Sequence, residues 1–96
     1  MSTYFVVNAS ITDRQLLDAY RAAVGASMEG HDVSVLVSTN DAEIIEGEPA
    51  GQRVVLLRFA DKDAFHAWYD SPAYQSVIGM RTGSTEGFAV LVDGRD

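Results

Sequence analysis

The neighbouring aromatic residues Trp68, Tyr69 and Tyr74 are the first candidates for a functional site in this sequence. Each ring offers a large apolar surface, and each tyrosine adds a hydroxyl that needs a hydrogen-bond partner. The rings could line a pocket for a flat ligand between helices and a sheet, or they could fill the core that holds those layers together. We assign Trp68 to the core and predict that Tyr69 and Tyr74, whose hydroxyls can point outward, contact a ligand.

His66 is a weak candidate for catalysis or ligand binding. Imidazole is the natural base near neutral pH, but a lone histidine is usually a surface residue. His66 and His31 lie at unrelated positions without a nearby pattern of acids, so we predict no metal site. A glycine-rich phosphate loop, a serine elbow and a Cys/His pair are also missing. The sequence therefore predicts no cofactor and identifies no catalytic residue.

Arg58 and Asn8 are polar residues within expected strands. Arg58 shares its side-chain direction with Val54 and Leu56 in an otherwise apolar segment. Because a buried guanidinium needs a carboxylate or several carbonyl groups, we expect Arg58 to pair across a subunit interface or at the mouth of a barrel. The alternative is that it binds an anionic ligand. Asn8 lies near the end of the first strand, where its amide could contact the same ligand or hold a turn.

The elements that position these residues follow from the periodicity of the sequence. Compact or alternating β-rich runs predict strands over residues 4–9, 33–37, 53–59 and 87–92, with a short hairpin partner at 42–46. A Thr12–Gln15 capping box, Asp61 and Ser71-Pro72 predict the starts of three helices.

This order of elements is typical of the α+β class and of the ferredoxin-like split βαβ plan, an antiparallel sheet with helices on one face. We expect one domain over residues 1–96.

The strands are apolar on both sides, which predicts a second subunit. Val55 and Leu57 face one side of their strand while Val54 and Leu56 face the other, and the first and last strands share this pattern. The helices can cover one face only, and monomers rarely expose so large an apolar patch. We expect this face to pack against its copy in a homodimer with a barrel-like core. The alternative is that the segment after Ala42 or the C-terminal residues fold over the sheet.

The sequence also resembles a known family along the tract from Arg53 to Gln75. Its Trp-Tyr-x-Ser-Pro-x-Tyr-Gln core, residues 68–75, is similar to that of the bacterial family described as domain of unknown function 1330. The resemblance implies a dimeric α/β barrel of ferredoxin-like subunits and carries no general activity. The chain departs from the family at Arg58, where an acid usually precedes the strand-ending Phe59, and at residues 38–40, where an Arg-Gly-Gly-like turn is usual.

Composition excludes several classes of partner. The net charge is −7, and residues 22–52 contain six acids and no lysine or arginine. Nucleic acids and anionic membrane surfaces both require a basic patch, so we expect neither as a partner. No apolar run approaches the length of a membrane span, and no signal peptide is visible. The absence of cysteine fits a reducing compartment, so we expect a cytoplasmic protein.

Three functions remain open. The first is a homodimer that binds a small apolar or aromatic metabolite. The second is a cofactor-independent monooxygenase- or isomerase-like enzyme that uses a pocket between helices and sheet, an analogy at the level of fold. The third is a structural or regulatory dimer. An enclosed pocket lined by Tyr69, Tyr74 and His66 would favour the enzyme, and a filled interior would favour the third function.

Overall fold

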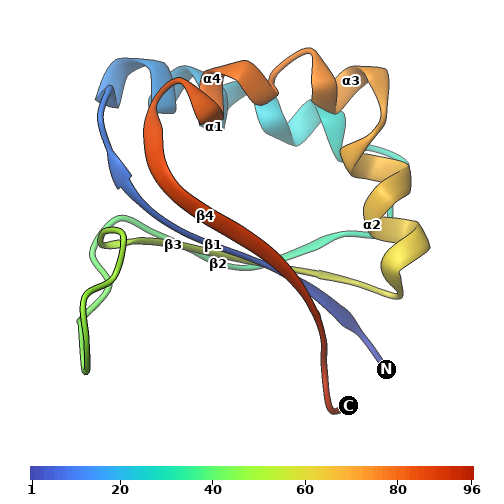
Figure 1. Ribbon diagram of the computed structural model, residues 1–96. Coiled ribbons are helices and arrows are strands. Elements are labelled where there is room, and N and C mark those ends of the chain that lie inside the picture. The colour runs from blue at the N-terminus through green and yellow to red at the C-terminus, as the bar shows by residue number, and fades with distance from the viewer.

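The computed structural model describes residues 1–96 and contains a four-stranded sheet with its helices on one face (Figure 1). The elements in chain order are β1 (Thr3–Ile11), α1 (Arg14–Ser27), β2 (Ser34–Thr39), β3 (Arg53–Phe59), α2 (Lys62–Tyr69), α3 (Pro72–Gln75), α4 (Ile78–Thr82) and β4 (Thr85–Asp93). The sheet order is β2-β3-β1-β4, and all neighbours are antiparallel. This arrangement confirms the predicted α+β, ferredoxin-like fold.

Side-chain caps start α1, α2 and α3, with one correction to the sequence-based prediction. Asp13, and not Thr12, caps α1, because its carboxylate accepts a hydrogen bond from the Leu16 amide at 3.0 Å. The Thr12 amide donates instead to the Ser84 carbonyl at 2.8 Å, which keeps Thr12 in line with β1. Asp61 caps α2 as predicted.

Ser71 caps the segment after α2, with Pro72 in its first turn. The helical segment is divided into α3 and α4, with Ser76 and Val77 between the two short helices.

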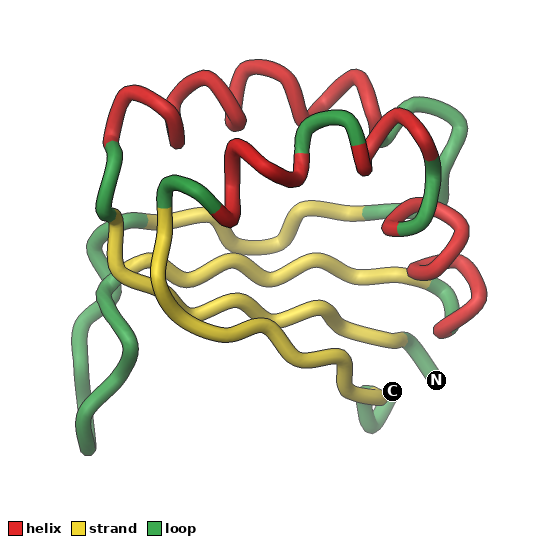
Figure 2. The backbone as a smooth tube through the Cα atoms, turned by 45° about the horizontal axis from the view of Figure 1, so that its top comes forward, coloured by secondary structure: helices red, strands yellow, loops and turns green.

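The predicted hairpin partner at residues 42–46 is wrong, since this stretch belongs to an irregular loop over residues 40–52. The Ala42 amide donates to the Gln52 carbonyl at 2.9 Å, but no ladder follows. Gly47 has a φ of 77° and Pro49 has no amide hydrogen, so neither supports a continuing strand. Figures 1 and 2 show this loop extending beyond the sheet, away from the helices.

The core lies between the sheet and the helix layer (Figure 2). The strand register puts Phe5 opposite Leu57 and Val7 opposite Val55, so that one face of β1 and β3 points toward the helices. Trp68 packs fully buried in this layer, and its indole nitrogen donates to the Ser27 hydroxyl at 3.1 Å. Trp68 is therefore a core residue, as predicted.

The opposite face of the sheet is apolar and has no helix over it. Phe88, Val90 and Val92 alternate along β4, and Phe88 is 53% exposed. Val37 on the edge strand β2 is also exposed on this side, where it pairs with Leu56 of β3. We call this surface the open face. It confirms that both sides of the sheet are apolar. No helix of the chain combines the length and apolar character needed to cross a bilayer.

Candidate ligand pocket

A cavity of about 140 Å³ lies between α1 and the helix-facing side of the sheet. Its apolar walls come from β1, β3, α1 and the core indole. They include Phe5, Val7, Val24, Met28, Leu57 and Trp68. Its mainly apolar lining makes it the candidate site.

Three arginines provide most of the polar lining of this pocket. Arg53 begins β3, Arg21 lies on α1 and Arg81 lies on α4. Arg53 is 5% exposed, and its Nη1 atom donates to the amide oxygen of Asn40 at 2.8 Å. Burial lowers the pKa of the Arg53 guanidinium, and the nearby charge of Arg21 lowers it further. The pocket is thus apolar over most of its wall, and all of its charged lining residues are positive.

Two buried tyrosines connect the helices at the pocket, and of the two Tyr20 is a lining residue. The hydroxyls of Tyr20 on α1 and Tyr74 on α3 are hydrogen-bonded at 3.0 Å, and Arg81 Nε donates to the Tyr74 oxygen at 3.1 Å. Burial raises the pKa of the Tyr20 hydroxyl, and Tyr74 adds to the effect. Tyr20 therefore remains a neutral phenol at physiological pH. The guanidinium of Arg81 also lies 6.0 Å from the centroid of the Phe5 ring.

None of the five side chains predicted from the sequence lines this pocket. Tyr74 is fully buried, and its hydroxyl points inward to Tyr20 and Arg81 and not outward as expected. Tyr69 is partly buried and stacks on Phe65, with ring centroids 5.1 Å apart. The aromatic cluster therefore forms packing between helices and sheet next to the cavity, and Tyr74 reaches it only through its hydrogen-bond partners.

His66 lies on the exposed side of α2, away from the cavity. Its Nδ1 atom is 3.6 Å from a carboxylate oxygen of Asp70, and both side chains are more than half exposed. Its ring contacts that of Phe65 edge-on at 5.0 Å. Asp70, one helical turn away, is the only acid beside this histidine, and His66 does not line the cavity.

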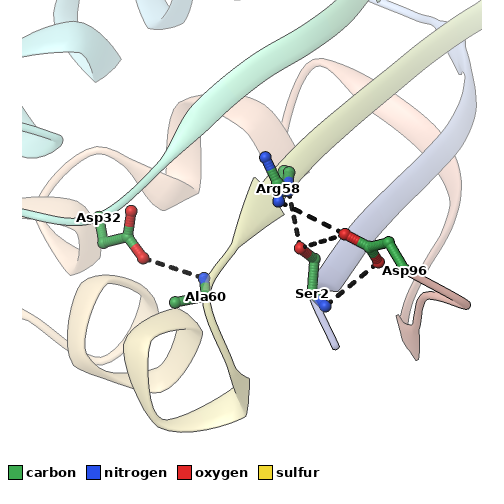
Figure 3. Close-up of polar contacts among 5 residues, drawn as sticks. All are labelled: Ser2, Asp32, Arg58, Ala60 and Asp96. Carbon is green, nitrogen blue, oxygen red and sulfur yellow. Dashed lines mark hydrogen bonds and ion pairs between the residues drawn. The ribbon is translucent and has the colours of Figure 1, made fainter.

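Arg58 projects from the open face of the sheet, as its position in the strand predicted. Figure 3 shows its contacts at the end of β3. Its Nε atom donates to the Ser2 hydroxyl at 2.7 Å, and Nη2 lies 3.4 Å from the Asp96 carboxylate. The Ser2 hydroxyl and amide also donate to Asp96, and these bonds, more than Arg58, lower the pKa of that carboxyl. In the same view Asp32 accepts a hydrogen bond from the Ala60 amide at 3.0 Å. Arg58 thus has a partner within its own chain.

Asn8 holds the end of the loop over residues 40–52. Its amide nitrogen donates to the carbonyls of Gly51 at 2.9 Å and Arg53 at 3.2 Å, and its amide oxygen accepts from the Ala50 amide at 2.9 Å. These three bonds fit the turn-holding role that the sequence left open.

The residues of the pocket were only partly accessible to sequence reasoning. Arg53 has the same parity as Val55 and Leu57, so the strand pattern already placed it on the helix-facing side. Tyr20 lies between Leu16 and Val24 at helical spacing, a pattern that indicates the buried side of α1. No sequence pattern indicated that Arg81 lines the pocket, because α4 is short and its direction depends on the preceding turn.

Comparison with known proteins supports the fold. The family model for domain of unknown function (DUF1330) matches residues 2–95. A protein of unknown function from Rhodopseudomonas palustris aligns with a TM-score of 0.80 at 13% identity, over 99% of this chain and 83% of that one. A dimeric ferredoxin-like protein of unknown function from Jannaschia sp. CCS1 aligns with a TM-score of 0.63 at 21% identity, over 100% of both chains.

An enzyme is also among the similar structures. SnoaB, a cofactor-independent oxygenase from Streptomyces nogalater, aligns with a TM-score of 0.70 at 14% identity, over 99% of this chain and 94% of that one. Identities this low establish a shared fold and no shared activity. No curated protein matches the sequence.

Proposed function

The chain belongs to the family described as domain of unknown function (DUF1330), and we propose that it acts as a homodimer whose subunits bind a small apolar or aromatic molecule in the pocket between α1 and the sheet. The observation that carries this proposal is the pocket itself, a cavity of about 140 Å³ with predominantly apolar walls. An apolar cavity of about 150 Å³ can hold one benzene molecule. The ligand is therefore about the size of a single substituted ring.

The homodimer is proposed from the open face. Phe88, Val90 and Val92 would remain in water in a single subunit, whereas two open faces packed together would bury them in a second core. Structures of this fold include proteins described as dimeric. The loop over residues 40–52 extends on the same side of the sheet, and in such a dimer it would flank the partner subunit.

An enzyme is the second candidate, supported by the likeness in fold to an oxygenase that needs no cofactor. The pocket supplies cations that could stabilise a negatively charged substrate, but it supplies no base. Tyr20 holds its proton through burial, arginine does not exchange protons near neutral pH, and His66 lies outside the cavity. We therefore favour ligand binding over catalysis as the function of the pocket. A structural or regulatory dimer is the alternative that requires no ligand.

Native mass spectrometry of freshly purified protein tests both parts of the proposal. We expect a dimer that releases a small molecule when activated in the gas phase. Trp68 is the only tryptophan and lines the cavity, so its fluorescence should also report binding of added single-ring compounds. Val24→Phe, which fills the cavity, should abolish that response, whereas Ala22→Phe on the exposed side of α1 should retain it. A protein that binds no apolar or aromatic compound by either method would contradict the proposal.

A further inference from the structure

We propose that the pocket is selective for anions, and that its ligand carries a carboxylate held by Arg53 and Arg81 next to a single-ring-sized apolar body. This inference rests on the proposed function and deepens it, because it names the chemical class of the ligand. It follows from the distribution of charge around the cavity, from the partners of each arginine, and from the neutral state of the Tyr20 hydroxyl, which also lines the cavity.

The cavity concentrates positive charge in an acidic protein. The chain has 7 lysines and arginines against 14 aspartates and glutamates. Arg21, Arg53 and Arg81 all line the cavity, and no acidic side chain does so. Three like charges around one apolar hollow repel one another, which makes the site unfavourable when empty and favourable for a ligand of opposite charge.

None of these arginines has an acidic partner within the chain. The ion pairs of the structure involve Arg14, Arg58, Lys62 and His66. Arg53 is nevertheless only 5% exposed, and its one side-chain acceptor is the uncharged amide oxygen of Asn40. A guanidinium removed from water ordinarily requires a carboxylate or equivalent acceptors. Burial first, and then the nearby charge of Arg21, lowers the pKa of this guanidinium, as an opposite charge in the pocket would not.

Tyr20, which lines the pocket, does not supply the missing negative charge. The raised pKa of Tyr20 keeps its hydroxyl protonated, and the hydroxyl of Tyr74 already accepts from Arg81 Nε at 3.1 Å. That contact uses one donor of Arg81 and leaves the two terminal nitrogens of its guanidinium available. Arg53 likewise uses Nη1 for Asn40. The remaining donors suit a carboxylate, whose two oxygens match the planar arrangement of guanidinium hydrogens.

A matched pair of probes tests this inference. Benzoate and benzamide have nearly the same shape and differ in charge. We expect benzoate to bind at least about tenfold more tightly than benzamide at pH 7, because a charge-assisted hydrogen bond in an apolar site is substantially stronger than a neutral one. Trp68 fluorescence provides the titration signal for both compounds.

Three variants place the selectivity in the pocket. Arg53→Met and Arg81→Met should each reduce benzoate affinity about tenfold while leaving benzamide affinity unchanged. Arg95→Met removes the same charge from an exposed position outside the cavity and should affect neither probe. If Arg53→Met does not fold, the partly exposed Arg81 still decides the question.

Each outcome separates the inference from the function on which it rests. Equal affinity for the two probes would overturn anion selectivity and leave the binding function intact. A benzoate preference that survives both pocket substitutions would also overturn it, because the charge would then be recognised elsewhere. Binding of neither probe would overturn both proposals.

Discussion

The hydroxyl of Tyr74 connects three helices, and its removal should destabilise the protein more than its size suggests. It is hydrogen-bonded to Tyr20 of α1 at 3.0 Å and accepts from Arg81 of α4 at 3.1 Å, while Tyr74 itself belongs to α3. Tyr74→Phe keeps the ring and its packing on Trp68, whose centroid is 4.0 Å away. The substitution therefore isolates the hydrogen bonds.

The magnitude follows from what the substitution leaves behind. Tyr20 is buried, so its hydroxyl would lose its partner without gaining water, and an unsatisfied buried polar group costs about 1–3 kcal/mol. The partly exposed Arg81 can regain water and adds little. We expect a loss of about 2 kcal/mol in the free energy of unfolding. For a domain of this length that corresponds to a decrease in Tm of roughly 10 °C.

Urea unfolding and calorimetry at one fixed protein concentration measure this loss, because the stability of a dimer depends on concentration. Tyr20→Phe and the double variant complete a double-mutant cycle. The double variant should cost about 1 kcal/mol less than the sum of the single changes, since it removes both ends of one interaction. Tyr69→Phe is the matched control, because its hydroxyl lies outside this network. A change of less than about 0.5 kcal/mol in the free energy of unfolding of Tyr74→Phe would contradict this role of the hydroxyl. Additive effects of Tyr74→Phe and Tyr20→Phe would contradict it as well.

Three further predictions concern the open face, the loop and alkaline pH. Val90→Asp should convert the dimer into a folded monomer in sedimentation experiments, whereas Ala26→Asp on the exposed side of α1 should not; a dimeric Val90→Asp protein would place the interface elsewhere. Asn8→Ala removes three hydrogen bonds and should accelerate amide hydrogen exchange in residues 40–52 at a cost of about 1–2 kcal/mol, and unchanged exchange would contradict its anchoring role. The raised pKa of Tyr20 contributes stability that is present below the unfolded value of about 10 and is lost as the pH rises above it. The stability advantage of the native protein over Tyr20→Phe should therefore shrink between about pH 10 and 12, and a constant difference would argue against the burial of this group.

Strand parity predicted much of the fold, and it contains a signal for one residue of the pocket that the sequence analysis did not use. The alternation in residues 53–59 placed Leu57 in the core and Arg58 on the opposite face, because a strand has only two sides and its register follows from them. The same rule puts Arg53 on the pocket side. The caps at Asp61 and Ser71 were also predictable, since each acts through an amide within its own first turn.

Features that depend on distant segments were not predictable in the same way. Thr12 and Asp13 are both good caps, and the entry of the chain into α1 is held by the distant Ser84 carbonyl, which accepts from the amides of both residues. The pocket is lined by residues of α1, β3 and α4, and its volume depends on the distance between α1 and the sheet. The spacing of residues within one segment does not reveal that distance. The candidate residues predicted from the sequence therefore lie outside the cavity.

The position of β1 has a consequence for how the chain folds. β1 is central in the sheet, yet it comes first in the sequence, and its neighbour β4 comes last. The hydroxyl of Thr3 donates to the carboxylate of Asp93 across 90 residues of sequence. Pairings at such separation must close almost the entire chain before they form, which slows folding relative to a protein built from local contacts. During synthesis, β1 would expose an unpaired apolar edge until β4 has left the ribosome, and loss of the last strand at any later time would expose that edge again.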